Sequence, residues 1–296
     1  MDSADERWGC NAVRVWRHMP RGQLAHYISS ITVINRDGEA RDHIHALPDG
    51  RATLLFCVCG DSRLTATGAF AHANGRLHVL GAATKAYSKN IQQTPLSIVV
   101  RFKTAGAYRF LRAPMHTLAN EDVELSDLWG TPGRNLTDAL TSATSTATRL
   151  NILETFLFEQ LERSRYRELR CVRLVTAALA SVQPFRSQEL RPAPTDDEIC
   201  PAASSRHIRR LFNDVVGVPP RTLMRIERFN YAVRLARDPE CPPWREIAST
   251  AGYYDQAHMI ADFNQFADIT PLRFLTALKS GLPHLSGIWF KSRSPR

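Results

Sequence analysis

The chain has 296 residues, of which 44% are hydrophobic, and its 38 Lys and Arg against 29 Asp and Glu give a formal charge of +9. This length and apolar content allow two domains of ordinary size. The sequence holds no apolar run near the roughly 18 residues of a membrane-spanning helix, which excludes that class of protein. The basic excess favours a polyanionic partner without establishing one.

The six cysteines show neither a CxxC pair nor metal-ligand spacing. Cys57 and Cys59 are two positions apart on a predicted strand, so they point to the same face and are poorly placed to bond each other. The sequence also lacks a signal-peptide pattern. We therefore expect reduced thiols in a cytoplasmic protein.

Residues 13–130 alternate short apolar segments with turn residues such as Pro48-Asp49-Gly50. This rhythm is typical of an antiparallel β-barrel or sandwich. We expect an α+β protein with a cupin-like N-terminal domain over these residues, followed by helical segments. A short helix is predicted over Ala105–Leu111. The clearest predicted strands are Tyr27–Ile34, Thr53–Cys59, Leu77–Leu80 and Leu96–Phe102.

Residues 131–170 change to a helical pattern, in which Leu and Ala recur at steps of three and four from Leu136 to Leu161. The pattern predicts either one long helix or two helices with a break. Such a stripe packs on its own domain or pairs two subunits, and both interpretations stay open. This segment is therefore a helical linker and a candidate dimerisation segment.

An arginine-rich helix is predicted from Ser204, which is placed to cap it, and the apolar residues from Ile208 to Val215 give it a buried face. Residues 206–234 hold seven Arg, opposed by Asp214 and Glu227. The helix is either a solvated surface helix or a contact with nucleic acid. The Arg cluster favours the second interpretation, because guanidinium forks fit phosphates and guanine edges. The predicted outer face carries Arg206, Arg209, Arg210 and Asn213.

A longer helix is predicted over Pro219–Asp238, and a short one over Trp244–Ala251. Gly252 then allows a turn, and Asp255 is placed to cap a further helix. A helix, a glycine turn and a helix with a polar outer face are the sequence form of a helix-turn-helix. In the last helix the predicted buried stripe is Met259, Phe263 and Phe266, and the predicted polar stripe is His258, Asp262 and Gln265.

Taken in order, these motifs resemble the DNA-binding domain of the AraC/XylS transcription regulators, in which one long helix joins two helix-turn-helix units. The resemblance spans residues 171–278. Its pieces are Ser204-x-Arg206-x-Ile208-x-Arg210-x-Phe212, Gly217-Val218-Pro219-Pro220, Glu246-Ile247-Ala248-x-x-x-Gly252-Tyr253, Asp255-Gln256-Ala257-His258, Phe263 and Thr270-Pro271. Three N-terminal pieces resemble the effector domain of one subgroup, namely Leu47-Pro48-Asp49-Gly50, Val100-Arg101-Phe102-x-x-x-Gly106 and Leu125-Ser126-Asp127-Leu128-Trp129-Gly130.

The resemblance implies double-stranded DNA as a partner and a bacterial, nucleoid-associated location. Arg209 or Arg210 would read a guanine edge in the first unit, and Gln256 an adenine edge in the second. Asp255 is expected to be a cap rather than a contact, because phosphates repel a carboxylate. The implied DNA-contacting residues are Ser205, Arg206, Arg209, Arg210, Asn213, Gln256, His258 and Ala261.

Two departures from the family pattern bear on affinity. Pro201 would stop the first scaffold helix, and the acidic run 196–198 precedes it, so the first unit is expected to be shortened or distorted. Residues 244–275 hold two Arg against four carboxylates, a net charge of −2. We expect the first unit to supply most of the affinity all the same.

The resemblance also implies a homodimer, a small-molecule effector at the N-terminal domain and contact with RNA polymerase. The candidate effector residues are aromatic, and the same residues fit a β-core: Phe56, Phe70, Tyr87 and Phe102. A regulator without a ligand, controlled by a protein partner, is an alternative. The C-terminal domain would span 171–278, with a basic tail over 279–296.

A cupin-type metalloenzyme is the main rival, because His43-x-His45 lies near His72 and His78 in sequence. A cupin site needs a carboxylate shortly after the His-x-His. Here the turn Pro48-Asp49-Gly50 follows instead, so these residues are interpreted as strand-end histidines. We expect no enzyme activity, no metal and no other cofactor.

Overall fold

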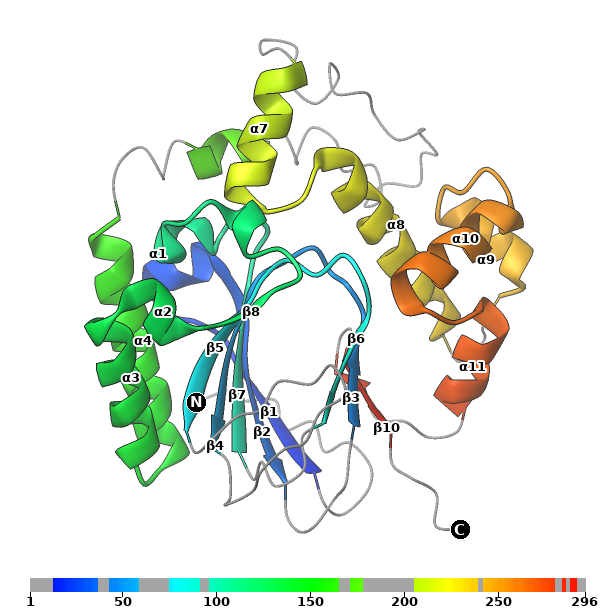
Figure 1. Cartoon of the computed structure of the whole chain (residues 1–296). Coiled ribbons are helices and arrows are strands. Elements are labelled where there is room, and N and C mark those ends of the chain that lie inside the picture. Colours follow the sequence, from blue (N-terminus) through cyan, green and yellow to red (C-terminus); the bar gives the residue numbers. More distant parts are fainter. Residues whose placement is uncertain are drawn as a thin grey trace.

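The computed structural model describes residues 13–36, 43–58, 75–90, 96–164, 171–177, 205–238, 242–279, 284–285 and 288–291. Figure 1 shows two β-sheets flanked by helices on one side and by a second group of helices on the other. No helix among these residues is long and apolar enough to cross a membrane.

The larger sheet has six strands in the order β1-β2-β7-β4-β5-β8, and their pairings are antiparallel. The antiparallel β-structure predicted for the N-terminal domain is therefore confirmed. The strands are β1 (Val13–His18), β2 (Ile28–Arg36), β4 (Thr53–Val58), β5 (Arg76–Leu80), β7 (Leu96–Phe102) and β8 (Asp122–Glu124).

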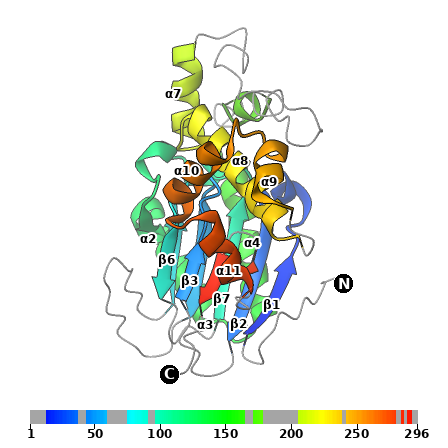
Figure 2. The ribbon, with the colours of Figure 1, turned by 90° about the vertical axis from the view of Figure 1, so that its right-hand side faces the viewer.

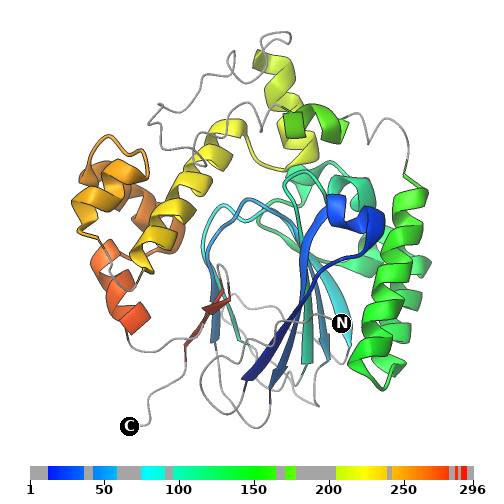
Figure 3. The ribbon, with the colours of Figure 1, turned by 180° about the vertical axis from the view of Figure 1, so that it is seen from behind.

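The smaller sheet joins strands from both ends of the chain, in the order β6-β3-β10-β9. Its strands are β3 (His43–Ala46), β6 (Tyr87–Asn90), β9 (His284–Leu285) and β10 (Ile288–Lys291). Trp289 of β10 lies opposite His45 of β3 in an antiparallel pair. The region predicted only as a basic tail thus returns to the N-terminal domain, as seen from behind in Figure 3.

The two faces of the larger sheet pack against different layers. On β4, Leu54 and Phe56 face a core that they share with the helices. Leu55 and Cys57 point the other way, into a small cluster that includes Tyr87 of β6. This alternation follows from the two-residue period of a strand, and it leaves both faces of β4 covered.

Helices cover the first of these faces. They are η1 (Gly22–His26), α1 (Tyr108–Leu111), η2 (Met115–Thr117), α2 (Leu125–Trp129), α3 (Thr131–Ser142) and α4 (Thr146–Glu162). The leucine stripe forms two helices with a break, and Ser145 caps the second by accepting a hydrogen bond from the Thr148 N–H. Leu136, Leu140, Leu153, Leu157 and Leu161 are buried in the N-terminal core, so they are not available to a second subunit.

The C-terminal helices are α7 (Ser205–Val215), α8 (Pro220–Ala236), α9 (Trp244–Thr250), α10 (Gln256–Ala267) and α11 (Pro271–Lys279). Residues 171–177 are also helical, while the acidic run 196–198 and Pro201 lie outside the described residues. Met259, Phe263 and Phe266 are fully buried, as predicted, against Phe229 of α8.

The helices α7 and α8 contact the N-terminal domain, and α7 stands above the sheets in Figure 2. Phe212 and Val215 of α7 share a core with Ala82 and Ala105 of the N-terminal domain. Gly217, which follows α7 at φ +95°, leaves room for the Met115 carbonyl; a Cβ there would lie 2.7 Å from that oxygen. Close packing therefore fixes α7 and the start of α8 on the N-terminal domain.

Candidate nucleic-acid interface

The helix α7 separates its apolar and basic residues onto opposite faces. Phe212 and Val215 are buried, and Arg206, Arg209 and Arg210 are exposed. The side chain of Asn213 is half-buried. The structure therefore brings the three predicted arginines to one solvent-facing side of a single helix, where an anionic surface can approach them. The side chain of Ser205 and the predicted cap Ser204 lie outside the described residues.

The turn before α10 is built as the sequence predicts. Gly252 adopts φ +77°, a backbone conformation that glycine reaches without steric cost. Asp255 is the N-cap of α10, and its Oδ1 accepts a hydrogen bond of 2.7 Å from the His258 N–H. This carboxylate satisfies one of the free N–H groups of the first turn. The prediction that Asp255 caps the helix is therefore confirmed.

Asp262 corrects the predicted polar stripe of α10, because its side chain is fully buried. Its Oδ1 lies 2.5 Å from Arg225 Nη2 of α8. Arg225 Nη2 also donates to Gln265 Oε1 at 2.6 Å, so one guanidinium ties α10 to α8 at two points. Burial and, after it, the charge of Asp262 raise the pKa of the neighbouring Tyr253 hydroxyl. A helical-wheel count places Asp262 on the outer face because it ignores a partner on another helix.

The outer face of α10 is exposed and without formal charge. Gln256, His258 and Ala261 are all exposed, and Asn264 and Gln265 continue the same face. Tyr254, in the turn, is 94% exposed, which makes it the most exposed large hydrophobic residue of the described chain. Sequence reasoning did not select Tyr254, although an aromatic residue beside a glycine turn could have drawn attention to it. The face offers hydrogen-bonding and apolar groups but no cation.

Burial also changes the charge of the second unit. Asp262 contributes no exposed charge, so the exposed charges of residues 244–275 are those of Arg245 and Arg273 against Glu246, Asp255 and Asp268. The exposed balance of residues 244–275 is −1, compared with −2 when the buried Asp262 is included. The second unit is thus closer to neutral than the sequence count indicates, and it is still less basic than α7.

The candidate effector residues do not come together. Phe56 and Phe102 are 0% and 1% exposed and lie in the core that packs on the helices. Tyr87 is half-buried on the other face of the sheet, and burial raises the pKa of its hydroxyl. Phe70 lies outside the described residues. Phe56 and Phe102 thus lie in one core and Tyr87 in another, and an effector role for them stays a prediction.

The histidines of the cupin interpretation are also separated. His43 and His45 are on β3, and His72 lies outside the described residues. His78 is buried on β5, with Nδ1 2.7 Å from Asp122 Oδ1 of β8. Among the described residues, no three His, Cys, Asp or Glu side chains gather as metal ligands would.

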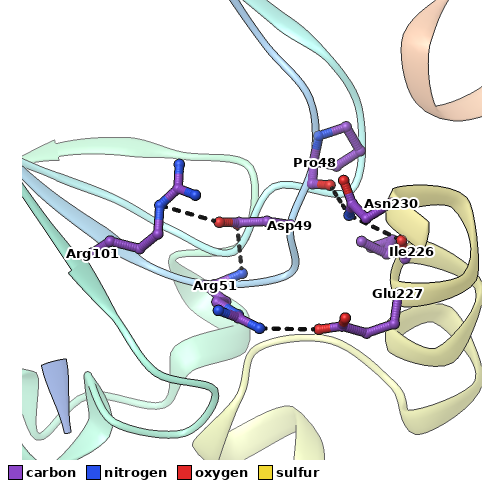
Figure 4. A network of polar contacts seen from close by, with 7 residues as sticks. All are labelled: Pro48, Asp49, Arg51, Arg101, Ile226, Glu227 and Asn230. Carbon is purple, nitrogen blue, oxygen red and sulfur yellow. Dashed lines mark hydrogen bonds and ion pairs between the residues drawn. The ribbon is translucent and has the colours of Figure 1, made fainter. Parts of the chain in front are cut away.

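The segment Leu47–Arg51 of the N-terminal domain packs against α8 of the C-terminal domain, and Figure 4 shows the polar contacts of this region. Leu47 is buried in the core of the C-terminal helices. The Pro48 carbonyl accepts a hydrogen bond of 2.8 Å from Asn230 Nδ2 of α8. Arg51 Nη2 lies 3.3 Å from Glu227 Oε1 of α8. The sequence marked this turn as a family motif, and its position against α8 gives it a physical role.

The backbone conformation at position 50 explains why this turn carries a glycine. The φ of Gly50 is +64°, and a Cβ at this position would lie 2.6 Å from Leu223 Cδ1 of α8. The positive φ favours glycine at this position, whereas the contact with Leu223 involves only the end of a flexible side chain. The loop therefore packs closely against the first turns of α8 at Leu223 and Ile226.

Two helices around a glycine turn, preceded by a long helix and an arginine-bearing helix, define a helix-turn-helix protein. Comparison with known families agrees: residues 202–277 match the family model described as a helix-turn-helix domain. Residues 16–124 match a second model, described as a domain of unknown function (DUF6597). The C-terminal part of the chain is therefore a helix-turn-helix domain of the AraC type, which confirms the resemblance.

No curated protein matches the sequence. Among solved structures, the chain is similar to ToxT from Vibrio cholerae with a bound unsaturated fatty acid, at 15% identity over 91% of this chain and 97% of that chain, with a TM-score of 0.37. ToxT bound to (E)-4-(8-methylnaphthalen-1-yl)but-3-enoic acid gives 14% identity, coverage of 90% and 99%, and a TM-score of 0.35. TM-scores this low do not establish that two chains share one arrangement.

Proposed function

We propose that this protein is a transcription regulator that binds specific double-stranded DNA through α7 and α10. The observation that carries the proposal is the exposed row of Arg206, Arg209 and Arg210 on a helix of an AraC-type domain. Three guanidinium groups on one face of a helix fit the phosphates and guanine edges of a major groove. On the opposite face of the same helix, Phe212 and Val215 are buried and hold the helix in place.

The two units have different roles in this proposal. Arg209 or Arg210 reads a guanine edge, and Arg206 contacts phosphate, with Ser205 and Asn213 at the border of the contact. Gln256, His258 and Ala261 of α10 contact bases with little electrostatic attraction, since their face has no formal charge. The first unit therefore supplies most of the binding free energy, and the second mainly adds specificity.

A footprint on DNA from upstream of the protein's own and neighbouring genes tests the proposal. The expected result is two protected segments on one face of the duplex, one for each unit. The binding must be measured at fixed salt, because each phosphate contact makes the affinity fall steeply with salt. Binding that is equally strong to unrelated DNA would contradict a sequence-specific regulator.

The N-terminal domain is the proposed regulatory part, because its Leu47–Arg51 segment holds α8, which lies between the two DNA-contacting helices. A ligand or protein partner that alters this contact alters the placement of α7 relative to α10. A thermal-shift screen tests the ligand arm, since a ligand of the folded state raises its melting temperature.

A further inference from the structure

A cavity of about 370 Å³ lies between the larger sheet and α8. This volume falls within the range of roughly 300–1,000 Å³ that small-molecule sites occupy. Its walls come from β1, β2 and β7, from the segment Leu47–Arg51 and from α8, so both domains contribute. Five of the twelve lining residues are arginines, namely Arg17, Arg51, Arg101, Arg234 and Arg237.

The two carboxylates of the lining already have partners within it. Asp49 Oδ2 lies 3.6 Å from Arg101 Nε, and its Oδ1 accepts a hydrogen bond of 3.0 Å from the Arg51 N–H. Glu227 Oε1 lies 3.3 Å from Arg51 Nη2. Five arginines against two carboxylates leave the lining with a net of three positive charges. Positive charge in a partly enclosed site concentrates anions.

At the C-terminal end of α8, burial and a neighbouring arginine make the charged form of one guanidinium less favourable. Burial, and after it the charge of Arg234, lowers the pKa of Arg237 to about 10. Both causes disfavour the charged guanidinium. An anion placed between the two arginines would reverse this effect, because it supplies opposite charge and replaces the lost water.

The remaining lining decides the kind of anion. Ser29, Ser30 and Asn230 add hydrogen-bonding groups, and the apolar side chains are Met19 and Val233. Met19 is 63% exposed, so it offers little shelter to an apolar chain. A long acyl chain therefore finds no apolar channel among these lining residues, whereas a compact molecule with several negative charges finds arginines on both the sheet wall and the α8 wall.

We propose that this interdomain cavity binds a compact polar anion with two or more negative charges, carried by carboxylates or phosphates, which bridges Arg17 and Arg101 of the N-terminal domain to Arg234 and Arg237 of α8. The inference rests on the proposed function, because it names the effector class and the place where the effector acts. The bound anion holds α8 against the sheet and so fixes the spacing of α7 and α10. The affinity for DNA therefore depends on the anion.

The test measures anion binding to the full chain directly. Citrate, glycerol 3-phosphate and decanoate are titrated separately, at ionic strength matched with chloride, and followed by melting temperature and calorimetry. Citrate or glycerol 3-phosphate is expected to raise the melting temperature and to bind at least about tenfold more tightly than decanoate. The two compact probes separate a carboxylate from a phosphate ligand.

Three variants locate the site. Arg17→Gln and Arg234→Gln change exposed residues on opposite walls, so both are expected to fold and to weaken binding of the compact anion by at least about tenfold. Arg221→Gln, which is exposed on the same helix but outside the lining, is expected to bind as the wild type does. Equal binding in all three variants, tighter binding of decanoate, or no response to either compact anion would overturn the proposal.

A parallel measurement of specific DNA binding separates this inference from the proposed function. DNA binding that is retained without any anion response overturns the cavity site alone. A chain that shows no specific DNA binding, with or without the anion, overturns the function on which the inference rests. Loss of DNA affinity in Arg234→Gln with unchanged anion binding would assign Arg234 to DNA and would also overturn the site.

Discussion

The two helix-turn-helix units differ in two respects: how closely they follow the family motif, and how much positive charge their exposed faces carry. The second unit has the regular form, with a glycine turn, an aspartate cap and three fully buried side chains under α10, and its outer face is uncharged. The first unit departs from the family pattern around Pro201, and α7 carries three exposed arginines. Family motifs therefore locate the fold, while the charge on the exposed face locates the expected binding energy.

The largest expected effect concerns the scaffold of the second unit. Phe263 is fully buried, with ring contacts to Phe229, Trp244 and Phe274. Phe263→Ala is expected to lower the free energy of unfolding by about 3–5 kcal/mol, because it leaves a cavity in this core. Denaturant unfolding measures the change. Ile260→Ala, on the partly exposed side of α10, serves as the control, and an equal cost for both would mean that α10 is not packed as described.

The arginines of α7 test the other side of the comparison. Arg209→Ala or Arg210→Ala is expected to weaken binding to the specific DNA site by about 1–3 kcal/mol, the free energy of a good two-point base contact. Fluorescence anisotropy with a labelled site at fixed salt measures it. Arg134→Ala removes the same charge from an exposed position of α3 and is expected to leave the affinity unchanged. A loss of DNA affinity in Arg134→Ala, with no loss in the α7 variants, would place the DNA against α3 instead of α7.

The buried Asp262 sharpens the electrostatic part of the comparison. Asp262→Asn removes the charged partner of Arg225 and is expected to lower the free energy of unfolding by about 1–3 kcal/mol. It also adds one net positive charge next to α10. Non-specific DNA affinity should therefore rise slightly at low salt, while the thermal stability falls. Unchanged stability would show that Asp262 is not held in this pair.

The polar face of α10 gives the smallest expected effect. Gln256→Ala and His258→Ala are each expected to cost about 1 kcal/mol or less of specific affinity, since single hydrogen bonds to a base edge contribute less than a two-point arginine contact. Their main effect should be a relaxed preference at one or two base positions. Selection of binding sites from a random DNA pool measures the base preference at each position. An unchanged preference in both variants would show that neither side chain contacts a base.

The helices were predictable from the sequence because their signals are local. The spacing of Met259, Phe263 and Phe266 gave the buried face of α10, and Asp255 gave its start. The break between α3 and α4 was one of two alternatives. The four predicted strands were correct in position because each is an apolar run between turn residues.

What the sequence did not predict depends on contacts between distant residues. Asp262 was placed on the wrong face because Arg225, its partner, is 37 positions away on another helix. The pairing of β10 with β3 joins the two ends of the chain. The arginine-lined cavity needs β1, β7 and α8 together, so no single stretch of sequence signals it. Local periodicity carries no information on such pairs.

The most direct test of the central claim compares two double variants on one DNA site in one buffer. Arg209→Ala/Arg210→Ala removes the charged contact of the first unit, and Gln256→Ala/His258→Ala removes the polar contact of the second. The first pair is expected to lose at least about tenfold more affinity than the second. An equal loss in both, or a larger loss from the α10 pair, would contradict the assignment of the binding energy to α7.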